Sequence, residues 1–267
     1  MDRRAWILSL VATLVLVAFV ASLVIPPAPR PADPIRSTTA PSEAAESAPP
    51  RIAPADLYAA IASPGSGTSF SQSVTLTVED AGHVVLPTGR LVASDAFIID
   101  SLPFAEAVPR GRYAVSVLVA DFADGDRRVA AAMVTVAPNQ PVRWELALVP
   151  GQDTSTLGPD EFFGYGVDGG TGSFTSPEAT EHLKDRGAYE TYSQKLMAAM
   201  NPGDGVFPLT VAVDIDPGSG ANVVAFSSGF GDGAYPTFVG LRSDGEPAVL
   251  LTDFGVLDAP GAQARSH

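Results

Sequence analysis

A run of apolar residues near the N-terminus constrains this 267-residue chain more than any other feature. Residues 6–25 carry no charge, and their only polar members are Ser9, Thr13 and Ser22. As a helix, a run of this length measures about 30 Å, which matches the hydrocarbon thickness of a bilayer. A cleaved secretory signal has a shorter apolar core of about 7–15 residues. The length therefore favours an uncleaved transmembrane helix over residues 6–25, with a cleaved signal peptide as the alternative.

The residues on either side of this run predict where the rest of the chain lies. Arg3 and Arg4 precede it, and basic residues stay on the cytoplasmic side of a membrane. We expect residues 1–5 to form a cytoplasmic tip and the C-terminal domain to lie outside the cytoplasm of a single-pass cell-membrane protein. Residues 26–54 are rich in Pro, Ala, Ser and Thr, which predicts a disordered, semi-rigid stalk.

Charge and cysteine content exclude several function classes. The formal net charge is −14, and the residues after position 54 carry 11 basic against 26 acidic side chains. A domain of this charge is repelled by nucleic acid, so we expect no nucleic-acid partner. The chain has no cysteine, which excludes disulfides, thiolate metal sites and a cysteine nucleophile.

Short alternating segments separated by turn signals predict a mainly β fold for one domain over residues 55–259, followed by a disordered tail at 260–267. The clearest strand is 111–120, and we expect 128–136 to return as its partner. Segments 84–86 and 91–93 flank a turn at 87–90 that predicts a hairpin. The other expected strands are 73–78, 141–148, 209–213, 222–226, 237–241 and 248–251. The pattern is typical of an antiparallel β-sandwich or barrel-like domain.

One helical insertion is expected between Ser176 and Met200. Ser176 is a good N-cap and Pro177 suits the first helical position. Gly187 is predicted to divide this helix into two pieces, because glycine is a poor helix former. We expect the helix to cover one face or edge of the sheet. A shorter helix is expected at 56–62, with Asp56 as its cap.

Two glycine-rich segments, 161–174 and 226–237, are the strongest candidates for a functional site. Each places an aspartate among glycines, hydroxyls and aromatic residues, a mixture that suits a shaped loop. We expect the two loops to converge on one pocket. The candidate ligand-binding residues are Asp168, Thr171, Ser173, Ser228, Asp232, Tyr235 and Thr237. The alternative is two tight β-connections in which Asp168 and Asp232 bond to nearby backbone amides.

Several motifs occur in an order that resembles a known family. They are residues 87–95, 109–113, 144–147, 164–172, 226–237, 241–245 and 251–254. Together they resemble the bacterial family known as domain of unknown function 4241, over about residues 74–257. The chain departs from the family pattern at Ser173, where a cysteine is common, and at Thr175 and Ser176, near an expected aspartate. The resemblance implies a single domain and supplies no activity.

Other chemistries fit the sequence less well. The segment 167–172 resembles the phosphate-binding turn of actin-like ATPases, but it lies past the middle of the chain and the α/β alternation of that fold is missing. The acidic pairs at 124–126 and 214–216 offer oxygen ligands for calcium without the spacing of a helix–loop–helix site. Ser228 lacks the leading glycine of a nucleophile elbow. We therefore expect no cofactor, with calcium as the one candidate.

These observations favour non-catalytic binding or interaction at the cell surface over an enzyme. The expected partner is a small molecule, a glycan or a surface protein, besides the membrane that holds the N-terminal helix. The aromatic side chains expected to stack on a ligand are Tyr165, Phe174, Phe230 and Tyr235. The alternative is a hydrolase or calcium-dependent enzyme that acts on a surface glycan, with Asp168 or Asp232 as acid, base or metal ligand.

Overall fold

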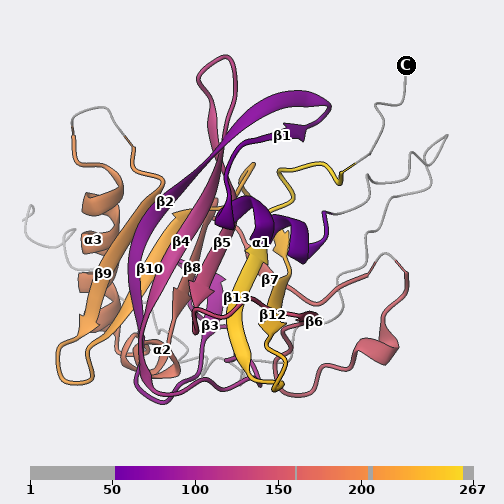
Figure 1. Cartoon of the computed structure of the whole chain (residues 1–267). Helices are drawn as coiled ribbons and strands as arrows, with labels where there is room; N and C mark the ends of the chain where they lie inside the picture. The colour runs from indigo at the N-terminus through magenta and orange to yellow at the C-terminus, as the bar shows by residue number, and fades with distance from the viewer. Residues whose placement is uncertain (1–51, 160, 204–206, 261–267) are drawn as a thin grey trace, which may run out of the picture.

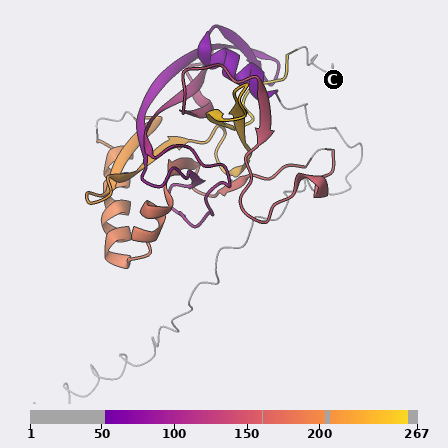
Figure 2. The ribbon, with the colours of Figure 1, turned by 60° about the horizontal axis from the view of Figure 1, so that its bottom comes forward.

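The computed structural model describes residues 52–159, 161–203 and 207–260 (Figure 1). The predicted transmembrane helix, its cytoplasmic tip and nearly all of the stalk and tail lie outside these residues. Within the described residues, no helix is both long and apolar enough to cross a membrane. The described chain is mainly β, with antiparallel sheets, a curled half-barrel and few helices, as Figure 2 shows from a second direction.

The larger sheet has seven antiparallel strands in the order β1-β2-β4-β5-β13-β12-β6. Its strands are β1 (Ser66–Ser69), β2 (Gln72–Leu86), β4 (Gly111–Asp121), β5 (Arg127–Thr135), β6 (Arg143–Leu146), β12 (Thr237–Leu241) and β13 (Pro247–Asp253). The predicted pairing of β4 with β5 is confirmed, with Ala114 opposite Thr135.

Strand β2 is one long strand where two were predicted. A bulge between Asp80 and Gly82 shifts its register with β4. Gly82 has a φ of 89°, and its N–H donates to Asp80 Oδ1 at 2.8 Å. This bulge turns the backbone without ending the ladder, so the apparent gap in the sequence pattern is a bend inside a strand.

The predicted hairpin around residues 87–90 is wrong. Strand β2 ends at Leu86 in the larger sheet, whereas β3 (Val92–Asp95) belongs to the smaller one. A Cβ on Gly89 would lie 1.9 Å from the Val108 carbonyl oxygen, so this crossover requires glycine. Residues 87–89 do form a turn, as the sequence predicts. A turn by itself does not determine whether the strands on its two sides pair with each other.

The smaller sheet has the order β3-β8-β10-β9, and a separate two-stranded ladder joins β11 to β7. The remaining strands are β7 (Tyr165–Val167), β8 (Thr171–Thr175), β9 (Thr210–Asp216), β10 (Ala221–Ser227) and β11 (Gly233–Tyr235). One face of this sheet contributes Phe174, Val224 and Phe226 to the main core that it shares with the larger sheet.

The other face of the smaller sheet is covered by helices α2 (Pro177–His182) and α3 (Arg186–Met200). Tyr192 and Leu196 of α3 pack there against Val213 and Val223 in a second, smaller core. The predicted insertion is thus two helices. The break falls before Asp185, which caps α3 by accepting the Ala188 N–H at 2.9 Å. Gly187 lies inside α3 and does not divide the helix.

Helix α1 (Pro54–Ala62) packs on the larger sheet through Leu57 and Ile61. Its N-cap is Ala53, so Asp56 lies in the first turn and is not the cap. A short 3-10 helix at Thr154–Thr156 completes the elements.

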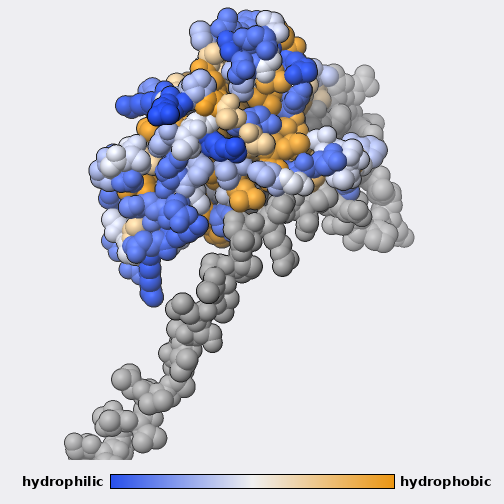
Figure 3. Space-filling view, turned by 90° about the horizontal axis from the view of Figure 1, so that it is seen from below, coloured by the Kyte–Doolittle hydropathy of each residue, from blue (hydrophilic) through white to orange (hydrophobic). Residues whose placement is uncertain are grey.

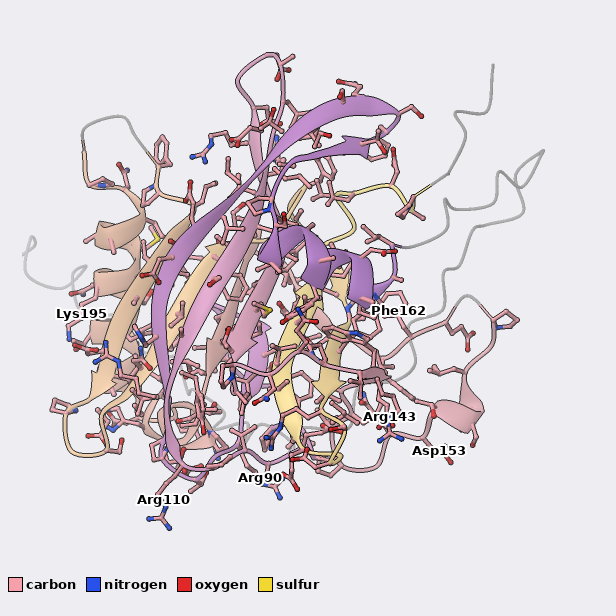
Figure 4. All side chains as sticks on the ribbon, viewed as in Figure 1. Arg90, Arg110, Arg143, Asp153, Phe162 and Lys195 are labelled. Atoms are coloured by element: carbon pink, nitrogen blue, oxygen red, sulfur yellow. The ribbon has the colours of Figure 1, made fainter. Side chains whose placement is uncertain are left out.

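Charged side chains such as Arg110, Asp153 and Lys195 project outward from the ribbon (Figure 4). Seen from below, apolar residues gather around the middle of a largely polar surface (Figure 3).

Candidate functional site

The two glycine-rich segments are neighbours in space, which confirms that part of the prediction, whereas a pocket that both loops line stays a prediction. Strands β7 and β11 pair so that Tyr165 lies opposite Tyr235. Beyond this ladder, the Gly170 N–H donates to Asp232 Oδ1 at 3.0 Å, and the Ser228 N–H donates to the Gly170 carbonyl at 3.1 Å. The loops that follow β7 and precede β11 therefore form one continuous surface, although Gly170 and Asp232 are 62 positions apart in the chain.

A third segment holds this surface in place through Asp95, a residue that the sequence did not single out. Asp95 is 3% exposed at the end of β3. One carboxylate oxygen accepts the N–H groups of Asp168 and Gly169 at 2.9 and 2.8 Å. The other accepts those of Phe97 and Ile98 at 2.6 and 3.1 Å. Asp95 thus fixes the first glycine-rich loop to the smaller sheet.

The hydroxyl groups among the predicted site residues are buried and bonded within the domain. Thr171, Ser173, Ser228 and Thr237 are at most 4% exposed. Their partners are the Gly169, Ser94 and Gly231 carbonyl oxygens and Thr252 Oγ1, at 3.2, 3.1, 2.8 and 2.8 Å respectively. These bonds stabilise the strands and loops of the site and leave the four hydroxyls away from the surface.

Three of the four aromatic residues expected to stack on a ligand point into the protein. Tyr165, Phe174 and Tyr235 are at most 7% exposed, so that expectation is wrong for them. The reason is packing: Tyr165 and Tyr235 meet edge to face with ring centroids 6.4 Å apart. The Tyr235 hydroxyl also donates to the carbonyl oxygens of Ser228 and Gly231, which closes its own loop. Burial raises the pKa of the Tyr165 hydroxyl far above its ordinary value.

The exposed part of the site consists of Asp168, Asp232 and Phe230. Both aspartates are exposed, and Phe230 is 46% exposed. Asp232 is positioned by its bond to Gly170, whereas the Asp168 carboxylate makes no hydrogen bond or ion pair within the described residues. These two carboxylates are available to a ligand.

A cavity of about 240 Å³ lies beside the other end of β7. Ala93, Ala147, Gly164 and Thr237 contribute to its wall, and each comes from a different motif of the sequence. Phe104, Phe163 and Tyr165 give it an aromatic lining, with Asp100 and Ser101 as polar groups. Asp168 and Asp232 do not line this cavity.

One aspartate of each pair considered for calcium accepts hydrogen bonds from nearby residues, whereas Asp214 lies within strand β9. Asp126 Oδ2 accepts from Arg128 Nε at 2.7 Å. Asp216 accepts from the Ser219 hydroxyl and from the Gly218 and Ser219 N–H groups, and these bonds hold its pKa below the ordinary value. Across residues 52–260, apart from the undescribed positions, no three His, Cys, Asp or Glu side chains gather as a metal site would need.

A family model described as "Protein of unknown function (DUF4241)" matches residues 84–252. The chain belongs to this family. No curated protein and no solved structure matches it. The region shared with the DUF4241 family contains Asp95, both glycine-rich loops and every residue of the cavity wall. It excludes the turn between β1 and β2, which contains Phe70, and the segment after β13, which contains Asp258.

Proposed function

We propose that this protein is a membrane-anchored, extracytoplasmic binding domain that contacts its ligand through the paired glycine-rich loops, without catalysis. One observation carries the proposal: the β7–β11 ladder and the Gly170–Asp232 bond bring two distant loops together and leave both carboxylates exposed. Backbone amides, a buried aspartate and inward-facing hydroxyls hold that surface rigid. A rigid surface loses little conformational entropy on binding.

The proposed ligand is a polyhydroxylated molecule such as a surface glycan. Exposed carboxylates accept hydrogen bonds from sugar hydroxyls, and charge-assisted bonds are stronger than neutral ones. Phe230 is the exposed aromatic residue of the two loops and offers an apolar contact beside Asp232. The proposed ligand therefore spans from Phe230 across Asp232 to Asp168.

Binding of the full-length protein to a panel of soluble hexose and N-acetylhexosamine oligosaccharides tests this proposal. Asp168→Asn should weaken binding of the recognised sugar by at least about tenfold, because a charged hydrogen bond is worth about 1.5–3 kcal/mol. Asp214→Asn, an exposed aspartate on β9, is the matched control and should leave affinity unchanged. If no sugar in the panel binds, the glycan assignment is lost.

The compartment is tested separately by protease shaving of intact cells. Residues 6–25 and the arginines before them support an exported domain, because basic residues stay in the cytoplasm. We expect external protease to remove the domain while the membrane stays intact. A domain that survives when known surface proteins are cleaved would contradict the proposed topology.

A further inference from the structure

The turn between β1 and β2 holds a phenylalanine in a strained, exposed conformation. Phe70 and Ser71 are its two central residues, with φ angles of 47° and 63°. Positive φ in such a turn favours Asn or Gly, and a bulky residue is disfavoured there. The Phe70 side chain is also 66% exposed, so burial does not offset this strain. Asp258 holds the turn, because its two carboxylate oxygens accept the Phe70 and Ser71 N–H groups at 3.1 and 2.8 Å.

The strained turn places Phe70 in a cluster of rings at the surface. The ring centroid of Phe70 lies 5.2 Å from that of Phe230, and Phe122 lies 6.4 Å from Phe230. The Arg128 guanidinium lies 5.4 Å from the centre of the Phe230 ring. We call Phe70, Phe122, Phe230 and Arg128 the Phe70 cluster. Three distant parts of the chain contribute to it, namely the β1–β2 turn, the β4–β5 hairpin and the loop before β11, so the fold assembles this surface.

The shape of the Phe70 cluster suits a peptide better than a sugar. The planes of Phe70 and Phe122 are tilted by 55° and 65° relative to Phe230, so the rings form a cup and not a flat platform. Sugars stack on flat faces, whereas proline rings and aliphatic side chains fit between tilted rings. Exposed Asp124 and Asp232 follow Phe122 and Phe230 by two residues and, within the described chain, form no ion pair. A basic, proline-containing segment matches this chemistry.

The chain itself supplies such a segment. Residues 26–36 contain five prolines together with Arg30 and Arg36. The described chain begins at Ile52, which lines the same cavity of about 550 Å³ as Thr68 and Asp258, the residue that holds the Phe70 turn. The described chain therefore begins near Asp258, on the side of the domain that carries the Phe70 turn. The residues between Arg36 and Ile52 can span about 50 Å when extended, which is ample for a return to the cluster.

We propose that the Phe70 cluster docks residues 26–36 of the same chain. The prolines occupy the cup between the rings, and Arg30 and Arg36 pair with Asp124 and Asp232. Covalent linkage raises the effective concentration of the segment, so even weak contacts keep it docked. The domain is then held in one orientation relative to the start of the stalk. The docked segment shares Phe230 and Asp232 with the proposed glycan site, so a bound glycan must displace it. The docking does not depend on that proposed function and is measured in the absence of sugar.

Distance measurement between two spin labels on the full-length protein in detergent micelles tests the docking. The native chain has no cysteine, so Ser37→Cys and Ala123→Cys give a unique pair of labels, one after the segment and one beside Phe122. The docked segment should give one narrow distance distribution. Phe70→Asn and Phe230→Ala should each abolish the narrow peak, and so should the paired change Arg30→Glu with Arg36→Glu.

Two variants serve as controls. The melting temperature of Phe70→Asn shows whether the domain still folds, and Val142→Ser shows whether loss of any exposed apolar residue has the same effect. Asn tolerates positive φ, so Phe70→Asn should not lower the melting temperature, and a lost peak then reports a lost contact. Val142→Ser alters another exposed apolar residue, 69% exposed, and should keep the narrow peak. A broad distribution in the native chain would overturn the proposal. A narrow peak that vanishes on dilution with unlabelled protein would also overturn it, in favour of a second copy as the occupant.

Discussion

Asp95 is the residue on which the geometry of the site depends most. Its buried carboxylate accepts four backbone N–H groups, two of them from the first glycine-rich loop. We expect Asp95→Ala to lower the free energy of unfolding by about 3 kcal/mol or more, because several buried donors lose their acceptor. Asp95→Asn retains one acceptor oxygen and should fall between the native chain and Asp95→Ala. Urea denaturation measures both variants, and an unchanged Asp95→Ala midpoint would contradict this role.

The buried carboxyl of Glu106 should make the free energy of unfolding decrease as the pH rises. Burial raises the pKa of its carboxyl, and one carboxylate oxygen is buried without a hydrogen-bond partner among the described residues. A raised folded-state pKa means that folding becomes less favourable as pH rises above about 4.5, the ordinary value. Glu106→Gln should therefore raise the free energy of unfolding at pH 7, by less than about 1 kcal/mol because solvent screens a half-buried group.

Denaturation at two pH values separates this effect from general stabilisation. Well below pH 4.5, the ordinary pKa, the carboxyl is protonated in both states, so Glu106→Gln should differ little from the native chain. Glu246→Gln, an exposed control, should show no such pH-dependent gain. An equal gain for Glu106→Gln at both pH values would show that charge is not the cause.

Residue types alone could locate the loops but not the orientation of their side chains. Asp168 and Asp232 are exposed as a ligand site requires, whereas Thr171, Ser173 and Phe174 face inward on β8. The difference arises because every residue of β8 is buried, whichever face of the smaller sheet its side chain occupies. A strand of five residues buried on every side has no period-two pattern from which its faces could be read.

At the scale of elements, the position of strand β7 depends on Gly164, which precedes the strand, and not on Gly166, which lies inside it. A Cβ on Gly164 would lie 2.6 Å from the Tyr235 carbonyl oxygen, whereas a Cβ on Gly166 would meet nothing within 4 Å. Gly164→Ala should therefore push β7 away from β11 and cost about 2 kcal/mol. Gly166→Ala, the matched control, should change the free energy of unfolding by less than about 0.5 kcal/mol. Equal effects in urea denaturation would contradict this packing.

Most strands could be predicted because their alternation is local, and β4, β5, β9, β10, β12 and β13 occur close to their expected positions. Two errors have a common physical origin. The bulge in β2 and the crossover after Leu86 are decided by contacts with distant strands, the first with β4 and the second with β8. The role of Asp95 could not be predicted from neighbouring residues, because its carboxylate accepts the N–H of Asp168, 73 residues further along the chain.

For the molecule as a whole, we expect stability not to depend on calcium. Asp126 and Asp216 already accept hydrogen bonds from their own turns. Thermal melts of the full-length protein with calcium and with a chelator should coincide, because an ion that binds only the folded state raises the melting temperature by mass action. A melting temperature that rises with calcium would contradict the assignment of these aspartates as turn residues.

The two glycine-rich loops are proposed to act as one recognition surface, and a double-mutant cycle tests that proposal directly. It compares the affinity for the recognised oligosaccharide in Asp168→Asn, Asp232→Asn and their combination. Asp232→Asn keeps an oxygen for the Gly170 N–H, so it removes charge without releasing the loop. We expect both single variants to weaken the same ligand and their effects to be non-additive, as for residues that share a partner. Unchanged affinity in either single variant would contradict a shared surface.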